Sequence, residues 1–220
     1  MVEFTPNLNK ILPRDTKTAW RALVPILPSA LYLCGGTAVA AHLAHRQSRD
    51  MDLFYHENAV DLDVLKHDLT VTGNFSIEHE GAGTLRGYFG STKLEILHSD
   101  EGGVQKCIEE PEVISGLRVA GLGDLAAMKV KAVGDRGQLR DYFDLKVIDE
   151  QGGISVEDAI AYYMVRFQIS EPGHVTIRHI VEALGYLDDV DEDKLLPATK
   201  KELETWWRVR QVRLIRNLGY

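Results

Sequence analysis

Two aspartates separated by one residue, Asp50 and Asp52, are the residues of this sequence best suited to chemistry. Asp50 precedes, and Asp52 lies within, the extended segment 51–55, which the pattern predicts to be a strand. Residues two apart in a strand share a face, so the two carboxylates would project side by side while Met51 and Leu53 face the core. Carboxylates held this close repel each other unless a cation lies between them. A divalent cation, Mg²⁺ or Mn²⁺, is expected because such ions bind one or two carboxylates together with substrate phosphates.

A glycine pair precedes these acids. The apolar run 31–34 predicts a buried strand, and Gly35-Gly36 predicts a tight turn, because glycine accepts positive φ and lets a ligand approach the backbone. Thr37 is a good N-cap, and the alanine-rich residues 38–44 favour a helix. The first turn of such a helix presents unpaired N–H groups, which form a natural phosphate site. These elements together predict a phosphate site beside the two aspartates.

The order of strand, glycine pair, short helix and Asp-x-Asp strand resembles the nucleotidyltransferase superfamily with a polymerase-β-like core. More narrowly, the sequence is similar to the abortive-infection toxin nucleotidyltransferases of the AbiEii/AbiGii type in two stretches, Gly35-Gly36-Thr37-Ala38 and Arg46-x-Ser48-x-Asp50-Met51-Asp52-Leu53-Phe54. The resemblance implies that Asp50 and Asp52 are catalytic metal ligands. It also implies that the nucleotide is bound by Gly35, Gly36, Thr37, Arg46 and Ser48.

A second region resembles the same family, whose corresponding segment carries a lysine, then an arginine, then a basic residue followed by aspartate. Here these residues are Lys129, Arg136 and the pair Arg140-Asp141. Lys129 and Arg136 are suited to hold a triphosphate, because nucleotidyl transfer depends chiefly on positioning and charge neutralisation. Asp141 could orient one of these cations or act on the acceptor hydroxyl. The resemblance favours catalytic roles for Lys129 and Asp141, and it leaves Arg136 and Arg140 open between function and a solvated helix face.

Glu95 is the candidate for a third metal-site carboxylate. It lies in the predicted strand 93–98, where Leu94 and Ile96 face one way and Lys93 and Glu95 the other. The superfamily places its third acid on such a neighbouring strand, although usually as aspartate. A glutamate at the surface is the alternative interpretation.

The elements around these residues predict an α+β protein: a small mixed-sheet nucleotidyltransferase core at residues 1–110, followed by a helical domain at 111–220. The linking segment 99–123 is expected to make short apolar contacts at 113–114 and 117–119, and Asp124 is expected to cap the next helix. The predicted strands are residues 31–34, 51–55, 75–78, 85–89 and 93–98. The other predicted helices are residues 15–27, 61–69, 139–148, 156–167, 176–185 and 198–218.

The final helix is locally basic. Leu203, Trp207, Leu214 and Leu218 form one apolar stripe, and Trp206, Arg210 and Arg213 lie along its edge. A cationic edge with an aromatic residue could contact an RNA backbone or an unpaired end. Arginine stems covering a helical core are the other interpretation.

The amino-acid composition limits the binding partners and the cellular compartment that are expected for this protein. A formal net charge of −8 over 220 residues argues against a protein that coats nucleic acid by charge alone. Two cysteines, Cys34 and Cys107, cannot form a disulfide framework, and no zinc-type ligand spacing occurs, so a reducing cytoplasm is expected. No segment approaches the roughly 20 consecutive apolar residues of a membrane span, so no membrane association is expected.

We therefore expect a Mg²⁺-dependent nucleotidyltransferase that uses an NTP. The family resemblance implies an RNA acceptor such as the 3′ end of tRNA, a role as the toxin of a toxin–antitoxin system, and a cognate antitoxin as partner. One alternative is a small-molecule nucleotidyltransferase that inactivates antibiotics, which the acidic overall charge favours for a cationic substrate. The other is a nucleotide-binding or partner-binding module without catalysis, which Glu95 in place of aspartate keeps open.

Overall fold

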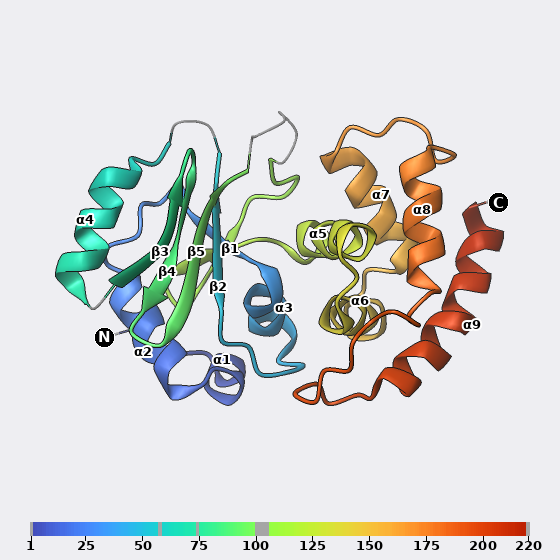
Figure 1. The fold of residues 1–220 in the computed structure, drawn as a ribbon, viewed down its shortest axis with the longest axis horizontal. Coiled ribbons are helices and arrows are strands. Elements are labelled where there is room, and N and C mark those ends of the chain that lie inside the picture. Colours follow the sequence, from blue (N-terminus) through green and yellow to red (C-terminus); the bar gives the residue numbers. More distant parts are fainter. Residues whose placement is uncertain (1, 57–58, 74, 100–105, 219–220) are drawn as a thin grey trace. The chain divides into compact units, whose positions relative to one another are not determined.

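The computed structural model describes residues 2–56, 59–73, 75–99 and 106–218. The chain forms two compact units, Met1–Gly121 and Leu122–Tyr220. The first contains a β-sheet with flanking helices, and the second is helical (Figure 1). The predicted α+β class, a mixed sheet followed by a helical region, is confirmed.

Within the described residues, seven strands form one mixed sheet in the order β3-β4-β5-β2-β1-β7-β6. β2 lies in the interior of this sheet, antiparallel to β1 on one side and parallel to β5 on the other. β4 and β5, two of the predicted strands, pair as an antiparallel hairpin. The strands are β1 (Tyr32–Cys34), β2 (Met51–Tyr55), β3 (Phe75–Gly81), β4 (Thr84–Phe89), β5 (Thr92–His98), β6 (Glu112–Ile114) and β7 (Leu117–Val119).

The hairpin of β6 and β7 extends the sheet beyond the predicted end of the core. Its residues were expected to make only short apolar contacts within a connection. Instead, β7 pairs in parallel with β1, with Leu33 opposite Val119, and Val119 is fully buried. The first compact unit therefore ends at Gly121, whereas the sequence placed the boundary at residues 110–111. Strands of three residues are too short to show a periodicity that distinguishes them from a loop.

The helices of the first unit are α1 (Pro6–Ile11), α2 (Arg14–Leu23), α3 (Gly35–Leu43) and α4 (Leu62–Thr72). α2 buries Thr16, Ala19, Trp20 and Leu23, the spacing of an amphipathic helix. It ends before Pro25, earlier than the predicted residue 27, and the short α1 was not predicted. α4 begins as expected after the N-cap Asp61, whose side chain accepts hydrogen bonds from two backbone amides.

The second unit contains α5 (Leu122–Asp135), α6 (Leu139–Gln151), α7 (Val156–Arg166), α8 (Val175–Leu184) and α9 (Lys200–Leu218). The predicted stripe of α9 is buried at Leu203, Trp207 and Leu214, whereas its last member, Leu218 at the end of the helix, is only half-buried. None of the helices in the described part of the chain combines the length and apolar character that a bilayer-spanning helix needs.

The prediction that Asp124 caps α5 was wrong. The helix begins two residues earlier, and Asp124 lies in its first turn with its side chain fully buried. There, Asp124 Oδ1 is 2.7 Å from Nη1 of Arg166 on α7, and neither side chain is exposed to solvent. A buried arginine on another helix leaves no local signal at Asp124, so a helix cap and a buried ion pair are indistinguishable from the sequence.

Arg210 of α9 joins three helices through two acids. Its guanidinium is 2.9 Å from Asp149 of α6 and also forms an ion pair with Glu157 of α7. The hydrogen bond from Arg210 lowers the pKa of Glu157 to about 2, and the same pair raises the pKa of Arg210. Arg210 therefore stabilises the helical packing, which leaves it unavailable for the RNA contact considered above.

This network predicts a pH dependence of stability. The folded-state pKa of Glu157 lies below its ordinary value of 4.5, so its contribution is present above about pH 4.5 and is lost as the pH falls towards 2. Between pH 5 and pH 2 the wild-type free energy of unfolding should fall. We expect this fall to be about 2 kcal/mol smaller in Glu157→Gln, a value that allows for solvent screening. Urea unfolding between pH 5 and pH 2 measures it. Glu171→Gln, at an exposed position of the same unit, should leave the pH profile unchanged; equal profiles for both variants would contradict the prediction.

Candidate active site

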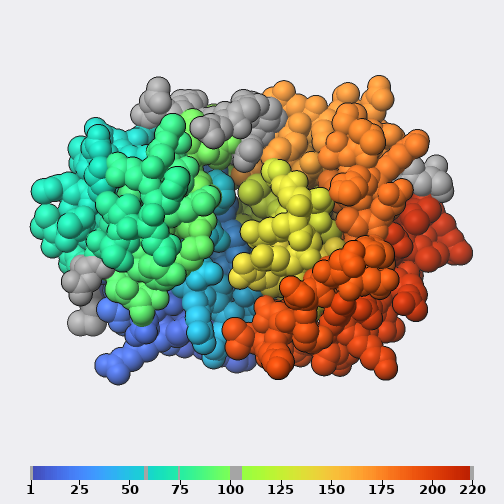
Figure 2. All heavy atoms as spheres, viewed as in Figure 1, coloured from blue at the N-terminus to red at the C-terminus, as the bar shows by residue number. Residues whose placement is uncertain are grey.

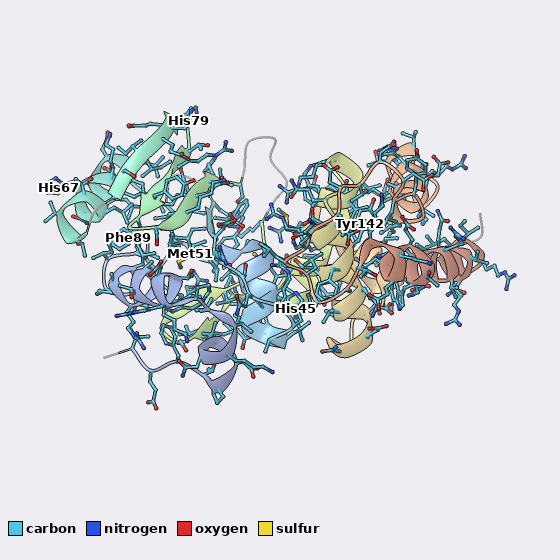
Figure 3. The ribbon with its side chains drawn as sticks, turned by 60° about the horizontal axis from the view of Figure 1, so that its bottom comes forward. His45, Met51, His67, His79, Phe89 and Tyr142 are labelled. Carbon is cyan, nitrogen blue, oxygen red and sulfur yellow. The ribbon has the colours of Figure 1, made fainter. Side chains whose placement is uncertain are left out.

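The two aspartates lie at the start of β2. The burial of this strand alternates, with Met51 and Leu53 in the core and Asp52 partly exposed, as predicted. Met51 points into the core of the first unit (Figure 3). Asp52 lies opposite Cys34 of β1 and opposite Glu95 of β5 in the strand register. An interior strand with partners on both sides therefore fixes the position of the Asp52 backbone.

The carboxylate of Asp52 lies directly against Gly35. Gly35 follows β1 and has φ +69°, and a Cβ atom there would be 2.1 Å from Asp52 Oδ2. At Gly36, a Cβ atom would be 2.2 Å from Nη2 of Arg46. Positive φ was expected at both glycines and occurs only at Gly35. The two glycines thus let a carboxylate and a guanidinium approach the backbone at the N-terminus of α3, where unpaired N–H groups attract anions.

Thr37 has a different position from the one predicted. α3 already begins at Gly35, so Thr37 lies inside the helix and is not its N-cap. Its buried hydroxyl forms a hydrogen bond of 2.7 Å with the Ser48 hydroxyl and donates to the backbone carbonyl of Asp50. Ser48 is buried as well. Both side chains therefore hold the segment that carries Asp50, which makes them positioning residues in this arrangement.

Glu95 lies beside Asp52, as its predicted strand position requires, but its carboxylate has partners. Oε1 is 2.6 Å from Nζ of Lys93, and Oε2 is 3.9 Å from Nε of Arg86. The pKa of Lys93 is raised, chiefly by the hydrogen bond to Glu95 and further by the charges of Asp50 and Asp52. Lys93 therefore lies within electrostatic reach of all three acids. Its spacing two residues before Glu95 was the sequence signal that could have identified it.

A second cluster of candidate residues lies within the helical unit. Nζ of Lys129 on α5 is 2.8 Å from Asp141 Oδ1 and 2.7 Å from Asp144 Oδ2, both on α6. Both aspartates are fully buried, and the Lys129 side chain is 7% exposed. Nε of Arg136 is 3.3 Å from Asp141 Oδ2, and this arginine is 54% exposed. The structure thus brings together Lys129, Arg136 and Asp141, which the sequence singled out.

This geometry favours one of the two roles considered for Asp141, since its two oxygens orient Lys129 and Arg136. Asp144 was missed by the sequence analysis. Its spacing of three residues from Asp141 places both on one face of a helix, which was the available signal. Lys129 is buried against two carboxylates, whereas the Arg136 side chain is 54% exposed, so Arg136 is the cation of this cluster that solvent reaches most easily.

Comparison with known proteins decides the family. The sequence model of a family described as nucleotidyl transferase AbiEii toxin, type IV toxin–antitoxin system, matches residues 20–206. The chain belongs to the AbiEii nucleotidyltransferase toxin family. The match includes both clusters, and the predicted family and enzyme class, a nucleotidyltransferase, are confirmed.

Three proteins similar to this AbiEii-family chain share 18–24% of its sequence. The uncharacterized protein aq_aa25 of Aquifex aeolicus strain VF5 is 24% identical over 200 residues, covering 89% of this chain and 90% of that protein. The crystal structure of JHP933 from Helicobacter pylori has a TM-score of 0.58 at 20% identity, covering 99% of this chain and 95% of that one. A candidate nucleotidyltransferase from H. pylori has a TM-score of 0.57 at 18% identity, covering 93% and 95%. These structures share the fold.

The first cluster of the AbiEii-family chain contains two carboxylates, Asp50 and Asp52, that would hold a divalent cation. The charges of both aspartates help to raise the pKa of Lys93, and the Gly35 backbone leaves room for the Asp52 carboxylate. Among the described residues, no group of three His, Cys, Asp or Glu side chains gathers as a ready metal site. Mg²⁺ is compatible with this set, because it is commonly held by one or two carboxylates and substrate phosphates.

Gly35→Ala tests the close approach of Asp52 in this AbiEii-family chain. The added methyl group would displace the carboxylate, and we expect transfer activity to fall about 100-fold, the typical cost of moving a catalytic group by about 1 Å. Gly90→Ala is the matched control, because Gly90 also has positive φ, +63°, but nothing lies within 4 Å of the added Cβ. Both variants should remain folded at the assay temperature, as thermal unfolding would show, whereas only Gly35→Ala should lose activity. Equal activities of the two variants would contradict the prediction.

Proposed function

We propose that this AbiEii-family protein transfers a nucleoside monophosphate from an NTP to RNA, such as the 3′ end of tRNA, in a Mg²⁺-dependent reaction. The observation that carries the proposal is the Asp52 carboxylate packed against Gly35 at the N-terminus of α3. A helix N-terminus attracts phosphate, and an acid beside it suits the metal ion that accompanies a triphosphate. Family membership supports the same enzyme class.

In the proposed reaction, an acceptor hydroxyl oxygen attacks the α-phosphorus and releases its proton to solvent, the bond between that phosphorus and the bridging oxygen breaks, and pyrophosphate leaves. Asp50 and Asp52 would hold Mg²⁺, which when bound supplies charge neutralisation at the reacting phosphate. Gly35 and Gly36 would present backbone N–H groups to the phosphates, and Arg46 adds a positive charge beside Gly36. Pre-oriented charges of this kind are usually the largest contribution to catalysis.

The remaining candidates receive supporting roles. Thr37 and Ser48 would position Asp50 through their hydroxyl contacts. Arg136 would contact the triphosphate, while Asp141 orients Arg136 and Lys129. Glu95 forms an ion pair with Lys93 and adds a negative charge next to the two aspartates. It would act as the third metal ligand when metal binding releases its carboxylate from Lys93.

The biological part of the proposal is a growth-arresting toxin that acts with a cognate antitoxin. It is supported by the family, whose description names a toxin of type IV toxin–antitoxin systems. Transfer of a nucleotide to the 3′ end of tRNA would arrest growth, because that end must be free to accept an amino acid.

The test is to incubate the purified protein with each α-labelled NTP, Mg²⁺ or Mn²⁺, and total tRNA. Label should enter tRNA with at least one NTP and should be lost when EDTA removes the metal. Parallel reactions contain an aminoglycoside or a lincosamide in place of tRNA. Label in the antibiotic instead of the RNA would contradict the proposed RNA acceptor and identify a small molecule as the acceptor. NTP binding without any transfer would favour a non-catalytic module and contradict the proposal.

A further inference from the structure

A groove on the helical unit lies outside both clusters described above. It has a volume of about 690 Å³ and is lined by residues of α6 and α9 and by Thr199, which precedes α9. The lining includes Trp206, Val209, Lys146, Lys201 and Arg213. α9, the red helix near the C-terminus, lies at the surface of its unit in Figure 2. The groove therefore combines an aromatic ring, apolar surface, several cations and one acid, Glu202, between α6 and α9.

Trp206 is the accessible tryptophan of this chain. The sequence has three tryptophans, and Trp20 and Trp207 are fully buried, whereas Trp206 is partly exposed. Trp207 packs edge-on against Tyr142, labelled in Figure 3, and its indole N–H donates to the Tyr142 carbonyl at 3.3 Å. The Trp206 ring contacts Trp207 at a centroid distance of 4.7 Å. The buried Trp207 thus supports the Trp206 ring edge-on, and Nζ of Lys146 lies 5.5 Å from the centroid of that ring.

The charge of α9 is opposite to that of the whole protein. The helix contains six basic and two acidic residues, a net charge of +4 in a chain whose net charge is −8. Arg210 is neutralised by Asp149 and Glu157. By contrast, no acid among the described residues forms an ion pair with Lys201 or Arg213, which line the groove.

We propose that this groove binds an unpaired segment of RNA, with a base stacked on Trp206 and neighbouring phosphates contacting Lys201 and Arg213. An exposed aromatic ring flanked by cations is typical of single-strand recognition, because every base offers a flat face and every nucleotide a negative charge. An acidic protein segment would satisfy the cations but would not use the accessible ring in this way. The inference rests on the proposed function, in which RNA is the acceptor, and it adds a binding surface to it.

The test uses the full chain carrying Asp52→Asn, without NTP, so that binding is measured independently of transfer. The probes are a single-stranded oligoribonucleotide of about ten nucleotides and total tRNA. Stacking should quench tryptophan fluorescence, because the accessible ring is Trp206. We expect Trp206→Leu to abolish the quenching and to weaken binding about tenfold. Arg213→Glu should weaken binding several-fold. It should also reduce the slope of the logarithm of the binding constant against the logarithm of salt concentration by about 1, the value for one lost phosphate contact.

Arg208→Glu is the matched control, because Arg208 is an exposed residue of the same helix that does not line the groove. It should change binding much less than Arg213→Glu while the thermal unfolding of both variants stays similar. Equal losses from the two reversals, or wild-type binding by Trp206→Leu, would overturn the proposal, as would binding of an acidic peptide but not of RNA. If wild type binds RNA in the groove but transfers no nucleotide to it, the proposed function fails and the groove assignment stands.

Discussion

Asp52→Asn should reduce nucleotidyl transfer by about 1,000-fold, the upper end of what is lost when one charge-stabilising group leaves a preorganised site. The amide keeps the size of the side chain but removes its negative charge, so the cation that it would share with Asp50 loses a ligand. The strand around it should be unaffected, because β2 is held by backbone pairing on both sides. Initial rates with labelled NTP and RNA measure the effect.

The control for this variant is Asp68→Asn, on α4 of the same unit, which removes the same charge at a position away from β2. It should retain full activity, and both proteins should unfold at the wild-type temperature. Full activity of Asp52→Asn in a correctly folded protein would refute the assignment of the catalytic acids. Raising the Mg²⁺ concentration should restore part of the activity if the aspartate acts through the metal.

Asp124→Asn should have the largest effect on stability, about 3–5 kcal/mol, because it leaves the buried guanidinium of Arg166 without its carboxylate. The loss should appear as a lower urea midpoint with an unchanged slope. Asp135→Asn on the same helix is the matched control. It breaks the exposed pair of Asp135 with Lys131, and such surface pairs contribute less than about 1 kcal/mol.

The double variant Asp124→Leu/Arg166→Met completes the test. It removes both charges together, so it should be more stable than Asp124→Asn, as is often found when a buried pair is replaced by apolar residues. If Asp124→Asn and Asp135→Asn were equally stable, the buried pair would not contribute as the geometry indicates. If the double variant were the least stable of all, shape and hydrogen bonding would outweigh the charge.

Local patterns were sufficient for the elements that carry the first cluster. The alternation of Met51 and Leu53 with the two aspartates predicted the faces of β2, and Gly35 marked the close approach at the start of α3. The extent of the sheet was not predictable in the same way. Residues 117–119 form a strand because β1 offers a free edge, and this depends on tertiary structure rather than on the local sequence.

The sequence also did not show which residue each polar side chain contacts in the fold. Thr37, Asp124 and Arg210 each carry a side chain that suits several positions: a cap, a buried bond or a solvent contact. The structure assigns each of them to a partner that is distant in the sequence. A sequence pattern gives the spacing along one helix or strand, but it does not contain the position of the second element, so these pairings could not be predicted.

The interior position of β2 has a consequence for the robustness of the enzyme. A residue on an edge strand or in a loop can shift through local fluctuations that cost little free energy. Asp52 is hydrogen-bonded through its strand to β1 and β5, so freeing its backbone requires opening the middle of the sheet, an event whose free energy approaches that of unfolding the whole unit. Competence for catalysis should therefore persist up to the temperature at which that unit melts, and then disappear in a single step.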